Sequence, residues 1–243
     1  FAEFLAGAAS VDDADRAARS AQVTGDDLAH ILFTSGTTGA PKGAMLEHRQ
    51  VCRAYLDFTE VIGLQYGDRY LVSNPFFHSF GLQAGILCCL MKGSTIIPLI
   101  VFDPDAVSAL IERERVTAYP GPPSVFLTLI DHPARQHHDL SSLRLVILGA
   151  AAIPVELIRR IRDELGLESV VTGYGITEST GIVAMCRYDD DPEIIATTSG
   201  RAIPGVAMKI VDDAGTELPS GEQGEILVQG HTIMRGYLDD PEA

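Results

Sequence analysis

The chain has 243 residues, of which 46% are hydrophobic, so it can bury a large core and we expect one sizeable globular domain or two lobes. Its formal charge of −15 argues against non-specific binding to nucleic acid or to an anionic membrane, because both need a basic surface. No apolar run approaches the roughly 20 residues of a membrane span, and residues 1–4 lack the basic region of a signal peptide. We therefore expect a cytoplasmic protein without a membrane span.

Residues 1–24 are rich in alanine and acidic side chains, and we expect a short surface helix or a frayed lead-in there. From 25 to 199, short apolar runs typical of strands alternate with longer runs typical of helices. The expected strands are 28–34, 70–73, 95–99, 116–119, 143–148 and 169–172, and the expected helices are 48–62, 82–91, 105–114, 124–130 and 154–165. This alternation predicts an α/β core with doubly wound, mostly parallel sheets and flanking helices.

After about residue 200 the pattern changes to short strands, 207–211 and 225–228, joined by turn sequences rich in Gly, Pro and Asp. Residues 200–243 therefore predict the start of a small antiparallel β subdomain.

Two groups of potentially reactive side chains do not have the spacing of a site. The four cysteines, Cys52, Cys88, Cys89 and Cys186, match neither a metal-ligand pattern nor a secreted disulfide scaffold, so we interpret them as buried thiols. The pair at 137–138 consists of two histidines in a polar segment, which predicts a solvated connection more than a ligand cluster.

Residues 34–43, TSGTTGAPKG, follow directly on an apolar run and combine three glycines, four hydroxyl groups and one lysine. Glycines allow backbone N–H groups to converge on an anion, the hydroxyls add neutral donors, and Lys42 supplies positive charge. The spacing differs from a Walker loop, which ends in Gly-Lys followed by Ser or Thr. We interpret the segment as a phosphate-binding loop; the alternative is a glycine-rich hairpin with a solvated lysine.

The loop resembles the phosphate-binding signature of the adenylate-forming superfamily, which contains acyl-CoA synthetases, luciferases and peptide-synthetase adenylation domains. Three further segments match that family in the same order: 74–81 (NPFFHSFG), 173–178 (GYGITE), and 224–226 (GEI) with 234–237 (MRGY). The resemblance covers the chain from about residue 25 to its end. In its overall sequence the chain is most similar to actinobacterial CoA ligases for fatty acids or steroid-derived acids.

The resemblance implies a role for each motif, with Tyr174 stacked on adenine and Thr177 donating to the α-phosphate of ATP. The implied nucleotide-binding residues are Thr34, Ser35, Gly36, Thr37, Thr38, Gly39, Lys42, Gly149, Ala150, Ala151, Gly173, Tyr174, Gly175 and Thr177. Glu178 is the implied ligand of Mg²⁺, since a carboxylate oxygen is a hard ligand. The implied catalytic residues are Lys42, His78, Thr177 and Glu178.

The implied acyl pocket is lined by His78, Phe80, Ala84, Ile176 and Ile182, with Leu82, Gly85 and Val183 as further candidates for its wall. The resemblance implies that His78 orients the substrate carboxylate; the alternative is a buried histidine satisfied by a backbone carbonyl. No acidic residue occurs from 74 to 99, so an amino acid would leave its ammonium unpaired there. We expect an apolar carboxylic acid.

The resemblance thus implies an acyl-CoA ligase that activates its acid with ATP and Mg²⁺ and passes the acyl group to coenzyme A. A carrier-protein thiol is the alternative acceptor, and a non-catalytic nucleotide-binding or assembly module is the alternative class. A homodimer is possible. The family continues past 236–237 to a ribose-binding aspartate and a mobile C-terminal domain with a catalytic lysine, and the chain stops at Ala243 before them. We therefore expect the central part of a longer enzyme, weakly active or inactive by itself.

Overall fold

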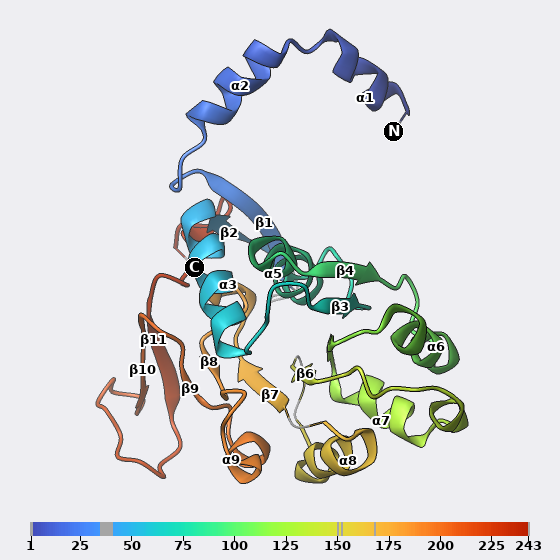
Figure 1. Cartoon of the computed structure of the whole chain (residues 1–243). Coiled ribbons are helices and arrows are strands. Elements are labelled where there is room, and N and C mark those ends of the chain that lie inside the picture. Colours follow the sequence, from blue (N-terminus) through green and yellow to red (C-terminus); the bar gives the residue numbers. More distant parts are fainter. Residues whose placement is uncertain (1, 35–40, 150, 152, 168, 243) are drawn as a thin grey trace.

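The computed structural model describes residues 2–34, 41–149, 151, 153–167 and 169–242 (Figure 1). The helical segments are α1 (Ala2–Gly7), η1 (Ala8–Ser10), α2 (Asp13–Gln22), α3 (His48–Val61), α4 (Ser79–Gly81), η2 (Leu82–Leu87), α5 (Cys88–Lys92), α6 (Pro104–Glu114), α7 (Pro123–Asp131), η3 (Pro133–His137), α8 (Val155–Leu165), η4 (Thr177–Ser179) and α9 (Pro192–Thr197). The strands are β1 (Leu28–Thr34), β2 (Lys42–Glu47), β3 (Arg69–Val72), β4 (Thr95–Pro98), β5 (Ala118–Gly121), β6 (Leu145–Leu148), β7 (Ser169–Tyr174), β8 (Ala184–Met185), β9 (Arg201–Ala202), β10 (Val206–Val211), β11 (Glu225–Gly230) and β12 (Gly236–Tyr237).

The main sheet has the strand order β4-β3-β5-β6-β7-β8-β9. Strands β4, β3, β5, β6 and β7 run parallel, and β8 and β9 continue the sheet in antiparallel pairing. Strands β10 and β11 form a separate antiparallel pair. The predicted α/β fold, with a mostly parallel sheet followed by a small antiparallel unit, is confirmed.

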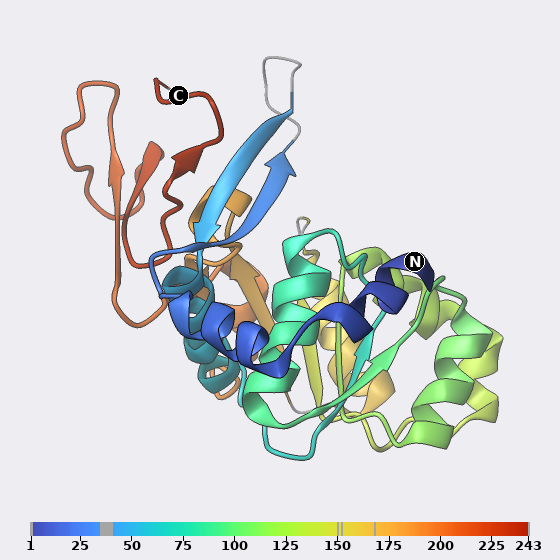
Figure 2. The same cartoon turned by 90° about the horizontal axis from the view of Figure 1, so that it is seen from above.

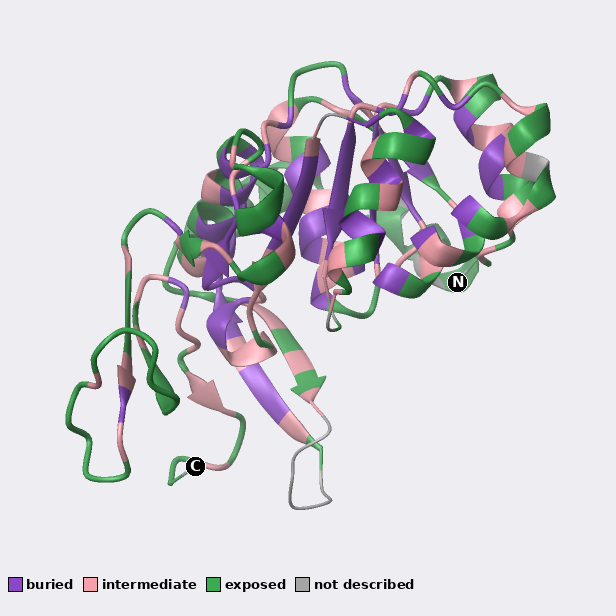
Figure 3. Cartoon of the chain, turned by 90° about the horizontal axis from the view of Figure 1, so that it is seen from below, coloured by how far each residue is buried: buried purple, intermediate pink, exposed green. Residues whose placement is uncertain are grey.

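Helices cover both faces of the main sheet. Successive residues of a strand point to opposite sides, so each central strand contributes apolar side chains to both helical layers. Along β6, Val146 and Leu148 join a cluster with residues of α6, α7 and α8, whereas Leu145 and Ile147 join a cluster with residues of α3, η2 and α5. Figure 3 shows the buried residues concentrated in these central strands, between the two layers of helices. The sheet is therefore doubly wound, as predicted.

The first predicted strand does not belong to the parallel sheet. Strand β1 pairs antiparallel with β2, and β12 pairs antiparallel with the other edge of β2, which gives a three-stranded sheet. Figure 2 shows β1 and β2 as a ribbon that extends away from the main sheet. The alternation of strand-like and helix-like runs missed β2, because Gly43 and Ala44 in this strand carry almost no side chain to produce a pattern.

The lead-in forms two short helices, and none of the residues of α2 is buried. Asp12 caps α2 by accepting a hydrogen bond from the backbone N–H of Ala14 at 2.6 Å. The surface helix expected in this segment is therefore present. None of the helices in the described residues is long and apolar enough to cross a membrane.

Three of the four cysteines, Cys88, Cys89 and Cys186, are buried free thiols as predicted. The prediction is wrong for Cys52, which is exposed. Helix α3 buries Val51 and Tyr55, and Cys52 lies on the side of the same helix that faces solvent.

The histidine pair at 137–138 lies at the surface end of η3, in the polar connection predicted there. His137 is exposed, and Nδ1 of His138 lies 2.6 Å from the Glu112 carboxylate. The polar partner of His138 is therefore a carboxylate on α6.

Candidate functional site

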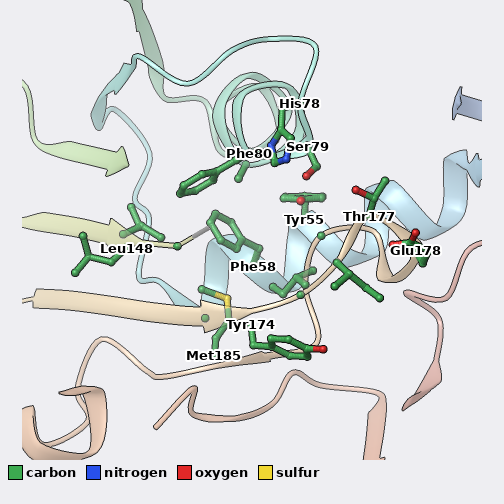
Figure 4. Close-up of a pocket in the computed structure, with 18 residues that line it drawn as sticks. Tyr55, Phe58, His78, Ser79, Phe80, Leu148, Tyr174, Thr177, Glu178 and Met185 are labelled. Carbon is green, nitrogen blue, oxygen red and sulfur yellow. The ribbon is translucent and has the colours of Figure 1, made fainter. Parts of the chain in front are cut away.

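A cavity of about 380 Å³ opens where β6 and β7 end, between the carboxyl edge of the main sheet and helices α3 and α4 (Figure 4). This edge is where open α/β sheets bind ligands. The cavity is lined by Tyr55, Phe58, His78, Ser79, Phe80, Ala84, Ile147, Leu148, Gly149, Gly173, Tyr174, Gly175, Ile176, Thr177, Glu178, Gly181, Ile182 and Met185.

The cavity brings together residues from motifs that are far apart in the sequence. All five residues of the predicted acyl pocket line it, namely His78, Phe80, Ala84, Ile176 and Ile182. The wall candidates Leu82, Gly85 and Val183 are not among its lining residues. Val183, just before β8, is 1% exposed and packs in the core instead of lining the cavity.

His78 stands at the rim of this cavity as the N-cap residue of α4. Its ring is exposed, and Nδ1 accepts a hydrogen bond from the backbone N–H of Phe80 at 3.1 Å. The alternative of a buried histidine satisfied by a carbonyl is therefore wrong. Because Nδ1 accepts, the neutral ring carries its proton on Nε2, which is left as a donor. Figure 4 shows His78 beside Ser79 at the top of the cavity.

Thr177 and Glu178 lie at the tip of a tight loop that follows β7. A Cβ atom on Gly175 would lie less than 3.0 Å from the carbonyl oxygen of Gly181, so only glycine permits this close approach of the two ends of the loop. Thr180 has φ +58°, and its hydroxyl donates to the carbonyl oxygen of Thr232 at 2.5 Å. The hydrogen bond to Thr232 stabilises the strained backbone at Thr180, and the loop in this conformation presents Thr177 and Glu178 to the cavity.

Glu178 joins the cavity to the three-stranded sheet. One oxygen of its carboxylate, Oε1, accepts a hydrogen bond from the Tyr237 hydroxyl at 2.7 Å and from Thr34 Oγ1 at 3.4 Å. The hydrogen bond to Glu178, together with burial and nearby negative charge, raises the pKa of Tyr237 to about 12. The Tyr237 hydroxyl therefore keeps its proton and remains a donor at neutral pH.

Lys42 opens β2 and is not freely solvated, because 29% of its side chain is exposed and Nζ lies 3.1 Å from the Asp240 carboxylate. The same Nζ lies 5.0 Å from the centre of the Tyr237 ring, a cation–π contact. The predicted residues Ser35, Gly36, Thr37, Thr38 and Gly39 lie outside the described residues, as does Ala150. The strands on either side of the predicted loop do form a hairpin, and its lysine has specific partners.

Tyr174 ends β7 and lines the cavity together with Gly149, which follows β6. Gly149 faces the Phe80 ring across the cavity wall, because a Cβ atom on it would lie 3.6 Å from that ring, an ordinary contact distance. Ala151 is exposed and is not among the residues that line the cavity.

Residues of α3 also line the cavity, which was not predicted from the sequence. Tyr55 and Phe58 line the cavity, and their ring centres are 5.6 Å apart. The Tyr55 hydroxyl donates to the carbonyl oxygen of Thr180 at 3.0 Å, and burial raises the pKa of this tyrosine. The spacing of the two rings on one face of the helix predicts burial, but it does not show that this face borders a cavity.

A magnesium ion fits the donor set of the loop. Within the described part of the chain, no cluster of three or more His, Cys, Asp or Glu side chains could enclose a metal. Glu178 is a single carboxylate at the cavity wall, and Mg²⁺ usually takes one or two protein carboxylates and completes its shell with phosphate oxygens and water.

Comparison with known proteins identifies the family of the chain. Residues 2–238 match the family model described as AMP-binding enzyme. The chain is 48% identical over 246 residues to a 3-[(3aS,4S,7aS)-7a-methyl-1,5-dioxo-octahydro-1H-inden-4-yl]propanoyl:CoA ligase of Rhodococcus jostii, a match that covers 100% of the chain and 45% of that relative. It is 47% identical over 241 residues to the enzyme of the same description from Mycobacterium tuberculosis, covering 99% of the chain and 45% of the relative. The chain thus spans about half the length of the curated relatives it matches.

Solved structures show the same fold. The N-terminal domain of FACL13 from Mycobacterium tuberculosis, solved with an inhibitor, has a TM-score of 0.83 and 31% identity, and the match covers 91% of this chain and 54% of that one. ATP-bound MatB from Rhodopseudomonas palustris has a TM-score of 0.82 and 32% identity, covering 90% of this chain and 42% of that one. Both likenesses extend over about nine tenths of this chain.

Proposed function

Because the chain belongs to the AMP-binding enzyme family, we propose that it forms the nucleotide- and acid-binding part of an AMP-forming acyl-CoA ligase. The observation that supports this most is the cavity itself, where the donors His78 and Thr177 and the carboxylate of Glu178 meet an apolar wall. A site for a carboxylic acid beside a nucleotide needs this combination, because the reacting end is polar and the rest of the acid is apolar.

The proposed reaction joins two anions, so the task of the protein is to position them and to neutralise charge. A carboxylate oxygen attacks the α-phosphorus of ATP, the bond to the bridging oxygen breaks, and pyrophosphate leaves. In this proposal Nε2–H of His78 donates to the carboxylate, Thr177 donates to the α-phosphate, and Lys42 binds the β- or γ-phosphate. Glu178 would hold Mg²⁺, which neutralises phosphate charge when bound. The sulfur of coenzyme A then attacks the carbonyl carbon of the adenylate, the bond from that carbon to the phosphate oxygen breaks, AMP leaves, and the thiol proton passes to solvent.

We propose a bicyclic keto acid as the substrate, by analogy with the two ligases of that description. The apolar part of the wall comes from Phe58, Phe80, Leu148 and Met185, and it offers a broad surface of rings and aliphatic groups. Burying apolar area supplies binding energy in proportion to the area removed from water. The same proposal places the enzyme in the cytoplasm and in lipid metabolism.

The proposal is tested by calorimetric titration of this chain with stable acyl-adenylate analogues that carry a linear, an aromatic or a bicyclic keto acid, with AMP as the reference. We expect the bicyclic analogue to bind at least tenfold more tightly than AMP and more tightly than the other two. Equal affinity for all analogues and AMP, in a chain whose circular dichroism shows an intact fold, would refute an acid-binding cavity.

A matched pair of variants locates the carboxylate end. His78→Ala should weaken binding of the bicyclic analogue, because it removes the donor at the rim, and leave AMP binding nearly unchanged. His137→Ala removes an exposed histidine that does not line the cavity and should change neither affinity. A loss that is the same for the analogue and for AMP would mean that His78 shapes the nucleotide site instead.

A further inference from the structure

Tyr237 contacts both of the charged side chains that the proposed reaction uses at the phosphates. Its hydroxyl donates to Glu178 Oε1 at 2.7 Å, and its ring lies 5.0 Å from Nζ of Lys42. These two side chains come from different parts of the structure, Glu178 from the loop after β7 and Lys42 from the hairpin. One tyrosine therefore touches the carboxylate and the lysine at the same time.

The backbone around Tyr237 is fastened to both of those parts. On the hairpin side, the N–H of Leu238 donates to the carbonyl oxygen of Gly43 at 2.8 Å, and the N–H of Arg235 donates to Met45 at 2.9 Å. On the loop side, the N–H of Met234 donates to the carbonyl oxygen of Glu178 at 2.8 Å. A side chain carried by so firmly paired a segment has little freedom to move, so its contacts define a fixed distance between loop and hairpin.

We propose that Tyr237 is a positioning residue that holds the Glu178 carboxylate and the Lys42 ammonium in the arrangement that binds magnesium and the triphosphate of ATP. This inference rests on the proposed function and adds a residue to it. Tyr237 is not among the residues that line the cavity, so it acts through Glu178 and Lys42.

The two ends of the tyrosine have separable effects. The hydroxyl orients the carboxylate through Oε1, and among the described residues no hydrogen bond engages Oε2 of Glu178, which is the oxygen that would bind a metal. Hydrogen-bonded neighbours tune metal ligands in this way. The ring attracts the ammonium of Lys42 and limits the positions that this flexible side chain explores. Removal of the hydroxyl alone should therefore weaken metal binding, and removal of the ring should also weaken binding of the triphosphate without metal.

The test measures binding by calorimetry on this chain, with a non-hydrolysable ATP analogue in the presence and absence of Mg²⁺, and with AMP. Tyr237→Phe removes the hydroxyl and keeps the ring, and Tyr237→Leu removes both. The matched control is Tyr66→Phe, which deletes the hydroxyl of a tyrosine that is 87% exposed. The thermal midpoint of each variant is recorded, so that a loss of fold is distinguished from a loss of positioning.

We expect Tyr237→Phe to weaken Mg²⁺ binding to the complex with the ATP analogue about tenfold, the lower end of the effect of removing a partner of a metal ligand. Its AMP affinity and thermal midpoint should stay close to those of Tyr66→Phe. Tyr237→Leu should also weaken the metal-free analogue. If wild-type chain binds analogue and metal together but Tyr237→Phe does so equally well, the positioning role is refuted and the proposed function stands.

Two other outcomes also overturn the inference. A parallel loss of AMP affinity and thermal stability in Tyr237→Phe would mean that the tyrosine acts on the fold. If the wild-type chain binds neither the ATP analogue nor AMP, the proposed function fails, and the positioning role fails with it.

Discussion

The Asp240 carboxylate forms an ion pair with Lys42, the lysine that the proposed reaction assigns to phosphate. Removing the charge of Asp240 should therefore tighten the binding of ATP. The carboxylate lies 3.1 Å from Lys42 Nζ, a separation at which Coulomb's law gives about 1.3 kcal/mol in water and about 5 kcal/mol at an effective dielectric of 20. The two side chains are 29% and 42% exposed, so solvent screens the pair and roughly 0.2–1 kcal/mol is the realistic contribution. Asp240→Asn should therefore tighten ATP by about 1.4-fold to fivefold.

The assay is calorimetric titration of wild-type chain and variant with a non-hydrolysable ATP analogue at low and high salt. AMP affinity should not change, because AMP has no β- or γ-phosphate for Lys42, and the gain for the analogue should shrink as salt screens the charges. Asp239→Asn is the matched control: it removes a neighbouring charge, and asparagine tolerates the φ of +56° at that position. If Asp240→Asn binds the analogue no better than Asp239→Asn, Lys42 does not exchange a carboxylate for a phosphate.

Three further predictions concern stability and accessibility. Gly175→Ala should destabilise the fold by about 1–3 kcal/mol because its Cβ would collide with backbone, whereas Gly7→Ala, with nothing within 4 Å, should be close to neutral in urea unfolding. Desolvation lowers the pKa of His30 in the folded chain, so as the pH falls through about 6.5 this histidine is protonated in the unfolded chain while it is still neutral in the folded chain. The free energy of unfolding should fall as the pH drops from 7.5 to 5.5, and the fall should be smaller in His30→Gln; an equal slope would contradict this. Cys52 should react with a maleimide in the native chain, and the other three thiols should react only after unfolding. If the native Cys52→Ser chain still reacts, the buried thiols are accessible to the reagent and the prediction is wrong.

The parallel core was predictable because its signal is local. The five parallel strands of the main sheet overlap short apolar runs, and helices such as α8 repeat their apolar residues at helical spacing. Residues 143–148 and 154–165 were therefore placed to within two residues of β6 and α8. A proline just before α8 and a glycine just after it, Gly166 at φ +66°, mark the ends of that helix.

The three-stranded sheet was not predictable in the same way, because its pairing is not local. Nothing in the short run at 236–237 says that it will pair with residues 44 and 45. The contacts of Tyr237 with Glu178 and Lys42 follow from that pairing and were missed with it. The cavity residues Tyr55 and Phe58 were missed for a related reason, since a helix shows which face it buries but not whether that face meets a sheet or a ligand.

The pairing of β12 with β2 joins positions near the two ends of the described chain, and it affects how the protein is made. During synthesis the hairpin and most of the main sheet leave the ribosome well before residues 236–237, so one edge of β2 has no partner while the rest of the domain folds. An unpaired strand edge is open to pairing with other chains, and closing so long a loop is slow. Assembly of the contacts that Tyr237 makes with Glu178 and Lys42 is therefore a late step in folding, and a nascent chain that stalls before residue 236 is a candidate for aggregation.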